Sequence, residues 1–454
     1  MIKNILMSSL RSANDYFKLG LKCMQSSPPR YEEASCIFRF LYQNIPESER
    51  EKIVKFIVQC GVGLHDKELM SFVSTVESKN LCRQCELASF MLNDKVHKEK
   101  RDECQLEVDE QSEFWQSDNI WDDVILVCAG GDKLLQQLYC NLKSLEKFWY
   151  TGSNELENIP IVIAHADEIR KFEEIKIKNA FTSLNIVFFD IAQSALILES
   201  RFSASSLRGY QIKIAAMVAI RARRVLLMDA DILWLRDPRK IIEKCKKEEV
   251  DAHLFSDFWH FMRRRHEKSS STSFLYSLYG VDFDVCEFES GVVYLNREKA
   301  YKSVAMLRYI LMNYEYYFSL AFGDKDLFYL SLKKENAKIS ISGMPKMLGC
   351  VYDEGHKGRD ANVFYSQSMV QSFDSVPSHI HTTLHPVGDE GFDVPSHLCE
   401  DGEKIEFVQR KIDEKIVSTV ACDISNAVVL EKPNVYEHVY ICAMRDKYIY
   451  LKEK

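Results

Sequence analysis

The chain lacks any apolar run of signal-peptide or membrane-spanning length, because charged residues interrupt every candidate segment. It also lacks an Asn-x-Ser/Thr acceptor sequence for N-linked glycans. These absences disfavour a secreted glycoprotein and a protein held by a transmembrane helix. We therefore expect a cytoplasmic protein with no membrane span.

The chain has no excess of positive charge either. Lys and Arg number 59 and Asp and Glu number 67, so the formal net charge is −8. A protein that binds the nucleic acid backbone needs a cationic face, so we expect no nucleic-acid partner, although a local basic patch is compatible with this total. With 46% hydrophobic and 28% charged residues over 454 positions, the composition is typical of a globular protein of two or three domains.

The 14 cysteines show no regular spacing, and the chain is far longer than a disulfide-stapled domain. Cys82 and Cys85 form a single CxxC pair, and no second pair or nearby His completes a zinc-binding set. We interpret the cysteines as unpaired thiols of a reducing compartment. A metal or redox role for Cys82 and Cys85 is the weaker alternative.

Residues 1–95 show the periodicity of helices. Apolar residues recur at steps of three and four in YFKLGLKCM, EEASCIFRFLYQNI and EKIVKFIVQCGVGL. We expect a small all-α domain here, which packs against or binds a protein partner or a second copy of the chain. Residues 96–119 are strongly charged and are expected to form a linker.

Residues 120–390 follow a different pattern, in which short apolar runs alternate with helical segments. The runs are DDVILVCAGG, IPIVIAHA, LNIVFFDI and RRVLLMDADILWL. Such alternation predicts an α/β domain with a doubly wound, mostly parallel sheet. Ligands of these sheets bind at the carboxyl ends of the strands, where Gly130, Gly131 and Asp229 fall.

Residues 391–454 have a weaker pattern and are expected to form a C-terminal α+β extension. The segment EFVQRKIDEKIV is predicted to be helical, whereas NAVVLEK and HVYICAM are predicted to be strands. Nothing in this extension indicates a function.

The segment VLLMDADILWLRDP carries the main candidate site. Asp229 and Asp231 follow an apolar strand that should be buried on both faces, and their side chains point the same way because extended backbone alternates. Two buried carboxylates are costly unless a cation neutralises them. Oxygen ligands at this spacing suit Mn²⁺ or Mg²⁺ bridging a diphosphate. The alternative is a strand that simply runs into a polar loop.

Three further segments carry polar residues at comparable places. Lys213 lies in an apolar helix before the Asp pair, where it could reach a phosphate or simply extend into solvent. Glu289, Ser290 and Gly291 come immediately before an apolar strand, and Gly291 would allow a sugar or backbone to approach closely. Residues 323–326, Gly-Asp-Lys-Asp, open an amphipathic helix, where an Asp is also a routine N-cap.

The segment SHIHTTLHP places His379, His381 and His385 within seven residues. Three clustered histidines can form a zinc site, but no Cys or HExxH framework accompanies them. A single His that joins the Asp pair as a third metal ligand is the more economical interpretation, and the other two are then histidines without a role.

The order of these motifs resembles the fungal-type alpha-mannosyltransferase family, whose members include alpha-1,3-mannosyltransferases. VILVCAGG, GYQIKIAAM, VLLMDADILWLRDP, FESGVVYLNREKA, FGDKDLFYL and SHIH occur in the family's order over residues 121–386. The chain looks like glycosyltransferase family 71 and is also similar to the glycogenin-like family 8. The resemblance implies a GT-A fold, a nucleotide-sugar donor, a divalent metal ion and retention of anomeric configuration.

The resemblance also implies roles for particular residues. It places Asp324, Asp326 and Glu289 at the catalytic centre and makes Asp229, Asp231 and His381 the metal ligands. The implied donor-binding residues are Ala129, Gly130, Lys213, Asp229, Ala230, Asp231, Ser290 and Gly291. Val292, Asn296 and Arg297 depart from the family pattern, so the donor sugar and the acceptor stay open.

We therefore expect a metal-dependent retaining glycosyltransferase that moves a hexose, with mannose favoured, to a glycan or glycoprotein hydroxyl. The expected cofactors are Mn²⁺ or Mg²⁺ and a donor such as GDP-mannose. A UDP-hexose-dependent transferase of glycogenin-like type is the first alternative. A nucleotidyltransferase, or a non-catalytic scaffold that binds sugar nucleotides, represents a different class.

Overall fold

The computed structural model divides the chain into two compact units. The first comprises Met1–Cys104, Met262–Asp284 and Asn313–Phe322, and the second comprises Gln105–Phe261, Val285–Met312 and Gly323–Lys454. The residues that the structure describes are 13–25, 30–64, 67–72, 120–149, 159–194, 207, 209–257, 276, 281, 288–314, 317–318, 321, 323–351, 363–382, 394–399, 406–412, 415–423, 427–431 and 434–452.

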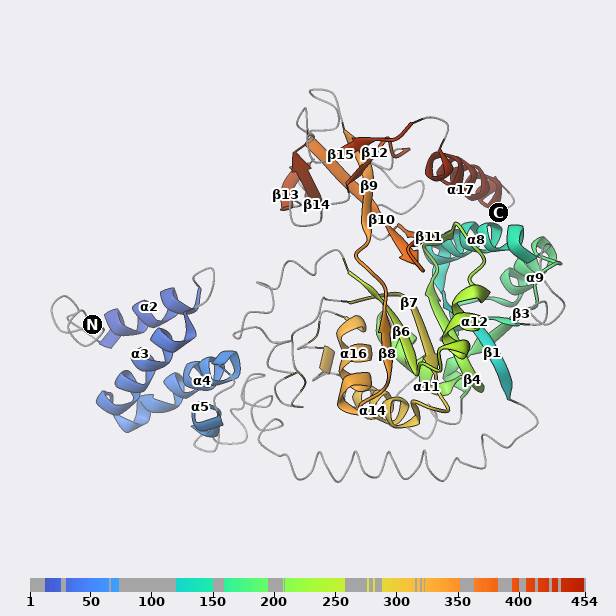
Figure 1. The fold of residues 1–454 in the computed structure, drawn as a ribbon. Helices are drawn as coiled ribbons and strands as arrows, with labels where there is room; N and C mark the ends of the chain where they lie inside the picture. Colours follow the sequence, from blue (N-terminus) through green and yellow to red (C-terminus); the bar gives the residue numbers. More distant parts are fainter. Residues whose placement is uncertain are drawn as a thin grey trace. The chain divides into compact units, whose positions relative to one another are not determined.

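The first unit is helical in its described N-terminal part, as its periodicity predicts (Figure 1). It contains α2 (Ala13–Met24), α3 (Tyr31–Asn44), α4 (Glu47–Leu64) and α5 (Lys67–Ser71). Aromatic rings fill its core, where Phe38 stacks on Phe56 with centroids 5.1 Å apart. Gly20 lets α2 approach α3 closely, because a Cβ there would lie 2.6 Å from the Phe38 ring.

The second unit is built on a seven-stranded sheet in the order β3-β2-β1-β4-β7-β6-β8 (Figure 1). Every neighbouring pair is parallel except the two that involve β7, so β7 alone runs against the others. The strands are β1 (Trp121–Cys128), β2 (Ile161–His165), β3 (Ile186–Asp190), β4 (Ala222–Asp229), β6 (Ala252–Ser256), β7 (Phe288–Asn296) and β8 (Ile339–Ile341). The prediction of an α/β fold with a mostly parallel sheet is confirmed.

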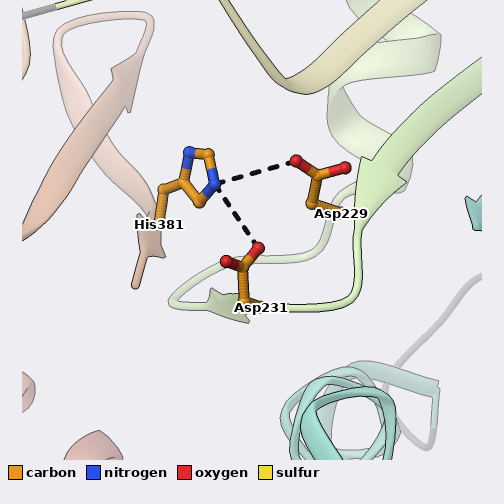
Figure 2. A group of neighbouring side chains, drawn as sticks. All are labelled: Asp229, Asp231 and His381. Atoms are coloured by element: carbon orange, nitrogen blue, oxygen red, sulfur yellow. Dashed lines mark ion pairs between the residues drawn. The ribbon is translucent and has the colours of Figure 1, made fainter. Parts of the chain in front are cut away.

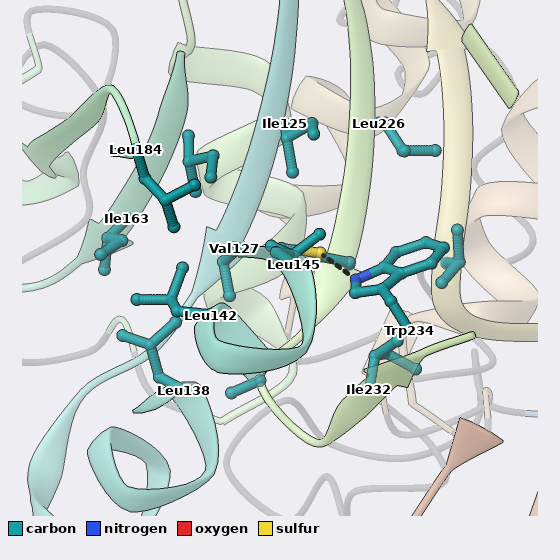
Figure 3. Packing of buried hydrophobic residues seen from close by; sticks show 14 of the residues in the cluster. Ile125, Val127, Leu138, Leu142, Leu145, Ile163, Leu184, Leu226, Ile232 and Trp234 are labelled. Carbon is teal, nitrogen blue, oxygen red and sulfur yellow. Dashed lines mark hydrogen bonds between the residues drawn. The ribbon is translucent and has the colours of Figure 1, made fainter. Parts of the chain in front are cut away.

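Helices cover both faces of this sheet. One face packs into a large apolar core with α8 (Gly131–Trp149), α9 (Lys171–Ala180) and α12 (Arg239–Lys247), part of which is drawn in Figure 3. On the other side, α11 (Gln211–Ala219), α14 (Tyr301–Met312) and α16 (Lys325–Lys334) pack on one another, with α11 against β1 and α16 against β7. A short 3₁₀ helix, η4 (Ile191–Gln193), follows β3.

A second sheet brings distant parts of the chain together. Its main path is β13-β14-β10-β9-β12-β15, and β11 joins β10 to β5. Because β11 pairs with β5, the chain around residue 381 lies directly beside the chain that follows Asp229. The strands are β5 (Ile232–Trp234), β9 (Lys346–Val351), β10 (Val363–Phe373), β11 (Val376–His381), β12 (His397–Cys399), β13 (Glu406–Ile412), β14 (Lys415–Asp423) and β15 (Ala427–Val429).

Two secondary-structure predictions for the C-terminal extension are wrong. EFVQRKIDEKIV forms β13 and the start of β14, because antiparallel pairing from Glu406↔Ala421 to Ile412↔Lys415 overrides its local pattern. HVYICAM lies in helix α17 (Val435–Lys452), whose residues Val439, Ala443 and Tyr450 are buried at helical spacing. The strand predicted in NAVVLEK is confirmed as β15.

Helix α17 packs against α8, so the C-terminal extension contributes to the second unit rather than standing apart from it. Val439, Tyr440 and Ala443 of α17 share a small core with Cys140 of α8. Among the helices that the structure describes, none is both long enough and apolar enough to cross a bilayer.

Candidate active site

The two predicted carboxylates lie at the carboxyl end of β4. Asp229 ends that strand opposite Cys128 of β1, and Ala230 turns into the core before Asp231. Asn141 of α8 fixes the turn, since its Nδ2 donates to the Asp229 carbonyl oxygen at 3.1 Å. The side chains of both aspartates keep 19% exposure, so they face an opening rather than the core.

His381 completes a group of three possible metal ligands with these aspartates. The pairing of β11 with β5 sets His381 opposite Ile232, one position beyond Asp231. Its Nε2 lies 3.4 Å from Asp231 Oδ1 and 3.8 Å from Asp229 Oδ2, as Figure 2 shows. Thr382 holds the end of β11 against the chain before β5, because its Oγ1 donates to the Asp231 carbonyl at 2.9 Å.

The three side chains suit a divalent cation. One ligand atom from each of Asp229, Asp231 and His381 lies within 4.8 Å of the others. Two carboxylate oxygens and one imidazole nitrogen are ligands that Mn²⁺ accepts, and the incomplete set leaves coordination positions for a substrate oxygen. No other group of this kind occurs among the described residues.

Lys213 of α11 pairs with Asp229 and with a third carboxylate, Asp324. Its Nζ lies 2.7 Å from Asp229 Oδ1 and 3.4 Å from Asp324 Oδ2, and it donates to Ser290 Oγ at 3.2 Å. The side chain is only 12% exposed. Lys213 is therefore not a solvent-exposed surface lysine, but a buried cation that joins β4, β7 and the start of α16.

The Gly-Asp-Lys-Asp segment opens α16 next to this cluster. Asp324 occupies the N-cap position, yet its side chain makes no capping hydrogen bond. The side chain is 2% exposed, and its Oδ2 has no hydrogen-bond partner among the described residues, although Lys213 Nζ lies 3.4 Å away. Lys325 pairs with the buried Asp257 at 2.7 Å, and Asp326 is buried in the first turn. The alternative of a routine N-cap does not fit Asp324.

The buried charges shift one another's pKa values. Burial raises the pKa of Asp229 to about 7, against the pull of Lys213. Burial also acts to raise the pKa of Asp231, but the facing His381 outweighs it and the net shift is downward. For His381, burial is outweighed by Glu289 and Asp231, which raise its pKa well above the usual value. The carboxylates of Glu289 and Asp231 thus favour positive charge at His381.

Glu289 lies behind His381, inside β7. Its Oε2 accepts a hydrogen bond from the Gly291 amide at 2.8 Å and lies 2.7 Å from His381 Nδ1. Its Oε1 lies 3.4 Å from Gln371 Nε2 and 3.8 Å from His379 Nε2. Burial works against ionisation, but the two histidines outweigh it and hold the pKa of Glu289 well below its usual range.

The end of β1 lies at the same carboxyl edge of the sheet as Asp229. Ala129 is buried, and Gly130 passes so close to Glu168 that a Cβ would lie 2.2 Å from its Oε2. Gly131 has a positive φ of 73°, and nothing lies within 4 Å of the place of its Cβ. The Gly-Gly pair therefore turns the chain from β1 into α8 at the carboxyl edge of the sheet.

The structure brings most of the predicted site residues together. His379 is fully buried behind the cluster, with Nδ1 2.9 Å from Ser378 Oγ, while His385, Cys82 and Cys85 lie outside the described residues. Asn141 and Thr382, which fix the backbone of the two aspartates, were not predicted from the sequence. A polar residue on the buried face of the helix at 131–149 was the available signal for Asn141.

Comparison with protein families supports the assignment to sugar transfer. Residues 126–280 match the family model described as "Mannosyltransferase putative", which spans less than half of the chain and includes Lys213, Asp229 and Asp231. This match agrees with the expectation of a glycosyltransferase enzyme. No curated protein matches the chain significantly.

Several solved structures are distantly similar. A galactosyltransferase, LgtC, is 17% identical, with 48% of this chain and 73% of that chain covered and a TM-score of 0.34. The mannosyltransferase Ktr4p from S. cerevisiae is 11% identical, with coverages of 61% and 84% and a TM-score of 0.32. Core-mannan synthase A from Aspergillus fumigatus, solved as a Mn/GDP form, is 12% identical, with coverages of 50% and 78% and a TM-score of 0.30. Such low scores leave the site's own geometry as the basis for its function.

Proposed function

We propose that the α/β domain, residues 120–390, is a GT-A glycosyltransferase that uses a divalent cation to bind a nucleotide-sugar. The observation that carries this proposal is the grouping of Asp229, Asp231 and His381 at the carboxyl edge of the sheet. The family match over residues 126–280 favours a mannosyl donor such as GDP-mannose.

The cation would be held by Asp229, Asp231 and His381. Mn²⁺ bound there would supply positive charge to the diphosphate as the sugar departs. The residues themselves act by orientation: Asn141 and Thr382 donate to the backbone carbonyls of Asp229 and Asp231 and so hold the backbone from which both carboxylates extend. A preset ligand geometry reduces the reorganisation needed when the donor binds.

Lys213 and Asp324 would serve the donor beside the cation. The Lys213 ammonium lies between Asp229 and Asp324 and can turn toward a phosphate oxygen as a point charge. Oδ2 of Asp324 pairs with Lys213 but has no hydrogen-bond partner within the described part of the chain, so it is suited to accept a hydrogen bond from a sugar hydroxyl. Either Asp324 or Asp326 would then lie near the reacting carbon, where a carboxylate stabilises positive charge.

The transfer itself is a substitution at the anomeric carbon. An acceptor hydroxyl forms the new carbon–oxygen bond while the bond to the diphosphate breaks, and the hydroxyl proton passes to the departing diphosphate. Retention of configuration follows either from attack on the leaving-group side or from a transient bond to Asp324 or Asp326. The acceptor is a hydroxyl of a glycan or glycoprotein, and the N-terminal helices would recruit a protein partner.

Product analysis tests the function. The purified chain is incubated with Mn²⁺ and a panel of GDP- and UDP-sugars, and the released nucleotide is identified. We expect nucleoside diphosphate, with GDP-mannose as the preferred donor, and no release by Asp231→Asn. Pyrophosphate release would instead identify a nucleotidyltransferase, and Mn²⁺-dependent binding without any turnover would identify a scaffold.

A further inference from the structure

Glu289 occupies a different place from the carboxylates that face the opening. Its side chain is 3% exposed, against 19% for Asp229 and Asp231. Both of its oxygens are directed to protein groups: Oε2 to the Gly291 amide and His381 Nδ1, and Oε1 to Gln371 and His379. A carboxylate enclosed in this way cannot reach a sugar carbon without losing these contacts.

The contact with His381 determines which ring nitrogen carries a hydrogen. An ionised carboxylate only accepts hydrogen bonds, so Nδ1, at 2.7 Å from Oε2, must be the donor. In the neutral ring, Nε2 is then the atom with the free lone pair, and it is Nε2 that faces Asp231 at 3.4 Å. Histidines that bind metals are commonly oriented by a carboxylate on their other nitrogen.

Gly291 preserves the space that this pair needs. A Cβ at position 291 would lie 2.4 Å from Glu289 Oε2 and 2.5 Å from His381 Nδ1, which is closer than real Cβ atoms approach. Gly291 therefore serves the Glu289–His381 contact itself, rather than the approach of a sugar. The glycine, the glutamate and the histidine form one unit across β7 and β11.

Gln371 and His379, which lie beside Glu289 Oε1, are themselves held by further hydrogen bonds. Gln371 of β10 donates from Nε2 to the Ser256 carbonyl at 2.8 Å, which ties it to the end of β6. His379 is fully buried and holds Ser378 Oγ through Nδ1 at 2.9 Å. These groups belong to three strands, so the Glu289 carboxylate that contacts His381 is held from several parts of the chain.

We infer that Glu289 is a positioning residue, which fixes His381 with Nε2 toward Asp229 and Asp231 and so presets the third ligand of the cation site. This inference rests on the proposed function, because it assumes that the three residues bind a divalent cation. It assigns Glu289 no contact with substrate.

Mn²⁺ affinity, measured by isothermal titration calorimetry and by electron paramagnetic resonance of free Mn²⁺, tests the inference. Glu289→Gln keeps the size of the side chain but removes the fixed acceptor, so we expect Mn²⁺ binding to weaken about 10- to 100-fold. Gly291→Ala should weaken it as well, since it displaces the same contact. Tyr294→Phe is the matched control on β7: it removes a buried hydroxyl that has no partner among the described residues, and it should bind Mn²⁺ as the parent does.

A double-mutant cycle with His381→Ala shows whether Glu289 acts through that histidine. In the His381→Ala background, Glu289→Gln should have no further effect on Mn²⁺ affinity. Parent-like affinity of a folded Glu289→Gln variant would overturn the inference, and so would a full effect of Glu289→Gln without His381. A parent protein that binds no Mn²⁺ would instead overturn the proposed function, and the positioning role with it.

Discussion

The two ends of the β4–β7 strand pair surround their buried charged side chains differently. At one end, Arg297 is 3% exposed and donates to the carbonyls of Val218 and Ala222 at 3.0 and 2.9 Å, and also to that of Ile220. Val218 lies in the last turn of α11 and Ile220 is its C-cap, where the helix dipole favours a cation, and Ala222 is the first residue of β4. The protein itself thus accommodates the charge of Arg297.

At the other end, the acids outnumber the protein's own cations. Asp229, Asp231 and Asp324 share the ammonium of Lys213, and in the part of the chain that the structure describes an oxygen of Asp324 has no hydrogen-bond partner. The Arg297 end therefore meets its charge with backbone carbonyls, whereas the Asp229 end has more acids than cations. A cluster of buried acids with shifted pKa values is a candidate functional site.

Removing one acid from the Asp229 end should have the largest effect on activity. We expect Asp231→Asn to lower nucleotide-sugar turnover by about 100-fold or more, because it removes a cation ligand worth several kcal/mol. Its melting temperature should fall modestly, because the lowered pKa of Asp231 means that His381 stabilises this carboxylate in the folded chain. Steady-state kinetics and calorimetry measure the two effects, and parental turnover in a folded Asp231→Asn variant would contradict the role of Asp231.

Removing the shared cation should make the repulsion visible. Lys213→Met leaves Asp229 and Asp324 without their internal counter-charge, and we expect the free energy of unfolding to fall by about 3 kcal/mol. Added Mn²⁺ replaces part of that charge, so it should stabilise this variant more than it stabilises the parent. Denaturant unfolding with and without Mn²⁺ gives both values; an equal gain in parent and variant would mean that Lys213 and the cation do not act on the same carboxylates.

Substitution at the Arg297 end should change stability without changing Mn²⁺ binding. Arg297→Met leaves buried carbonyls without their donor, which we expect to cost about 2 to 3 kcal/mol of stability. Here Mn²⁺ should add the same increment as in the parent, and Mn²⁺ affinity should not change. The same unfolding series and a calorimetric titration measure these quantities. Weakened Mn²⁺ binding in Arg297→Met would show that the two ends are coupled.

His253 should give the smallest effect, because both of its ring nitrogens have hydrogen-bond partners within the protein. Its ring nitrogens contact Ser340 and Ser342, and burial lowers its pKa to about 4, with Asp374 raising it and Lys244 lowering it slightly. The unfolded chain, with an ordinary His pKa of about 6.5, binds more protons between these values. The stability that neutral His253 provides is therefore full above about pH 6.5 and is lost as the pH falls toward 4.

The His253→Gln variant isolates this contribution. We expect the parent to lose about 2 kcal/mol more stability than the variant between pH 7 and pH 4.5. Unfolding by urea at both pH values measures the difference. Parallel pH profiles for the two proteins would show that His253 is not buried in its neutral form.

The sequence predicted the parts of this fold that depend on local pattern. The apolar runs located β1 to β4, and the position of Asp229 and Asp231 at a strand end followed directly from them. The choice of His381 among three histidines depended on family resemblance, because the pairing of β11 with β5 joins residues far apart in the chain. Long-range pairing of this kind leaves no local signal.

The same limit explains the errors. β13 and β14 form through pairing with each other and with β10, which no periodicity within residues 406–423 reveals. For Glu289, only the folded chain brings Gln371, His379 and His381 around the carboxylate, and its place beside the donor sugar stays a prediction from the motif. Acidic residues are easily recognised in a sequence, but which partner each one meets is decided by the strand order.

Thermal unfolding with Mn²⁺ and nucleoside diphosphates tests the central claim most directly. A ligand that binds only the folded chain stabilises it by about 2.7 kcal/mol at a concentration of about 100 Kd. We predict that the melting temperature of the parent rises by a few degrees when Mn²⁺ and GDP or UDP are both present, and that Asp231→Asn shows no such rise. An equal rise without Mn²⁺, or in Asp231→Asn, would contradict the assignment of Asp229, Asp231 and His381 as the site that binds the cation and the nucleotide.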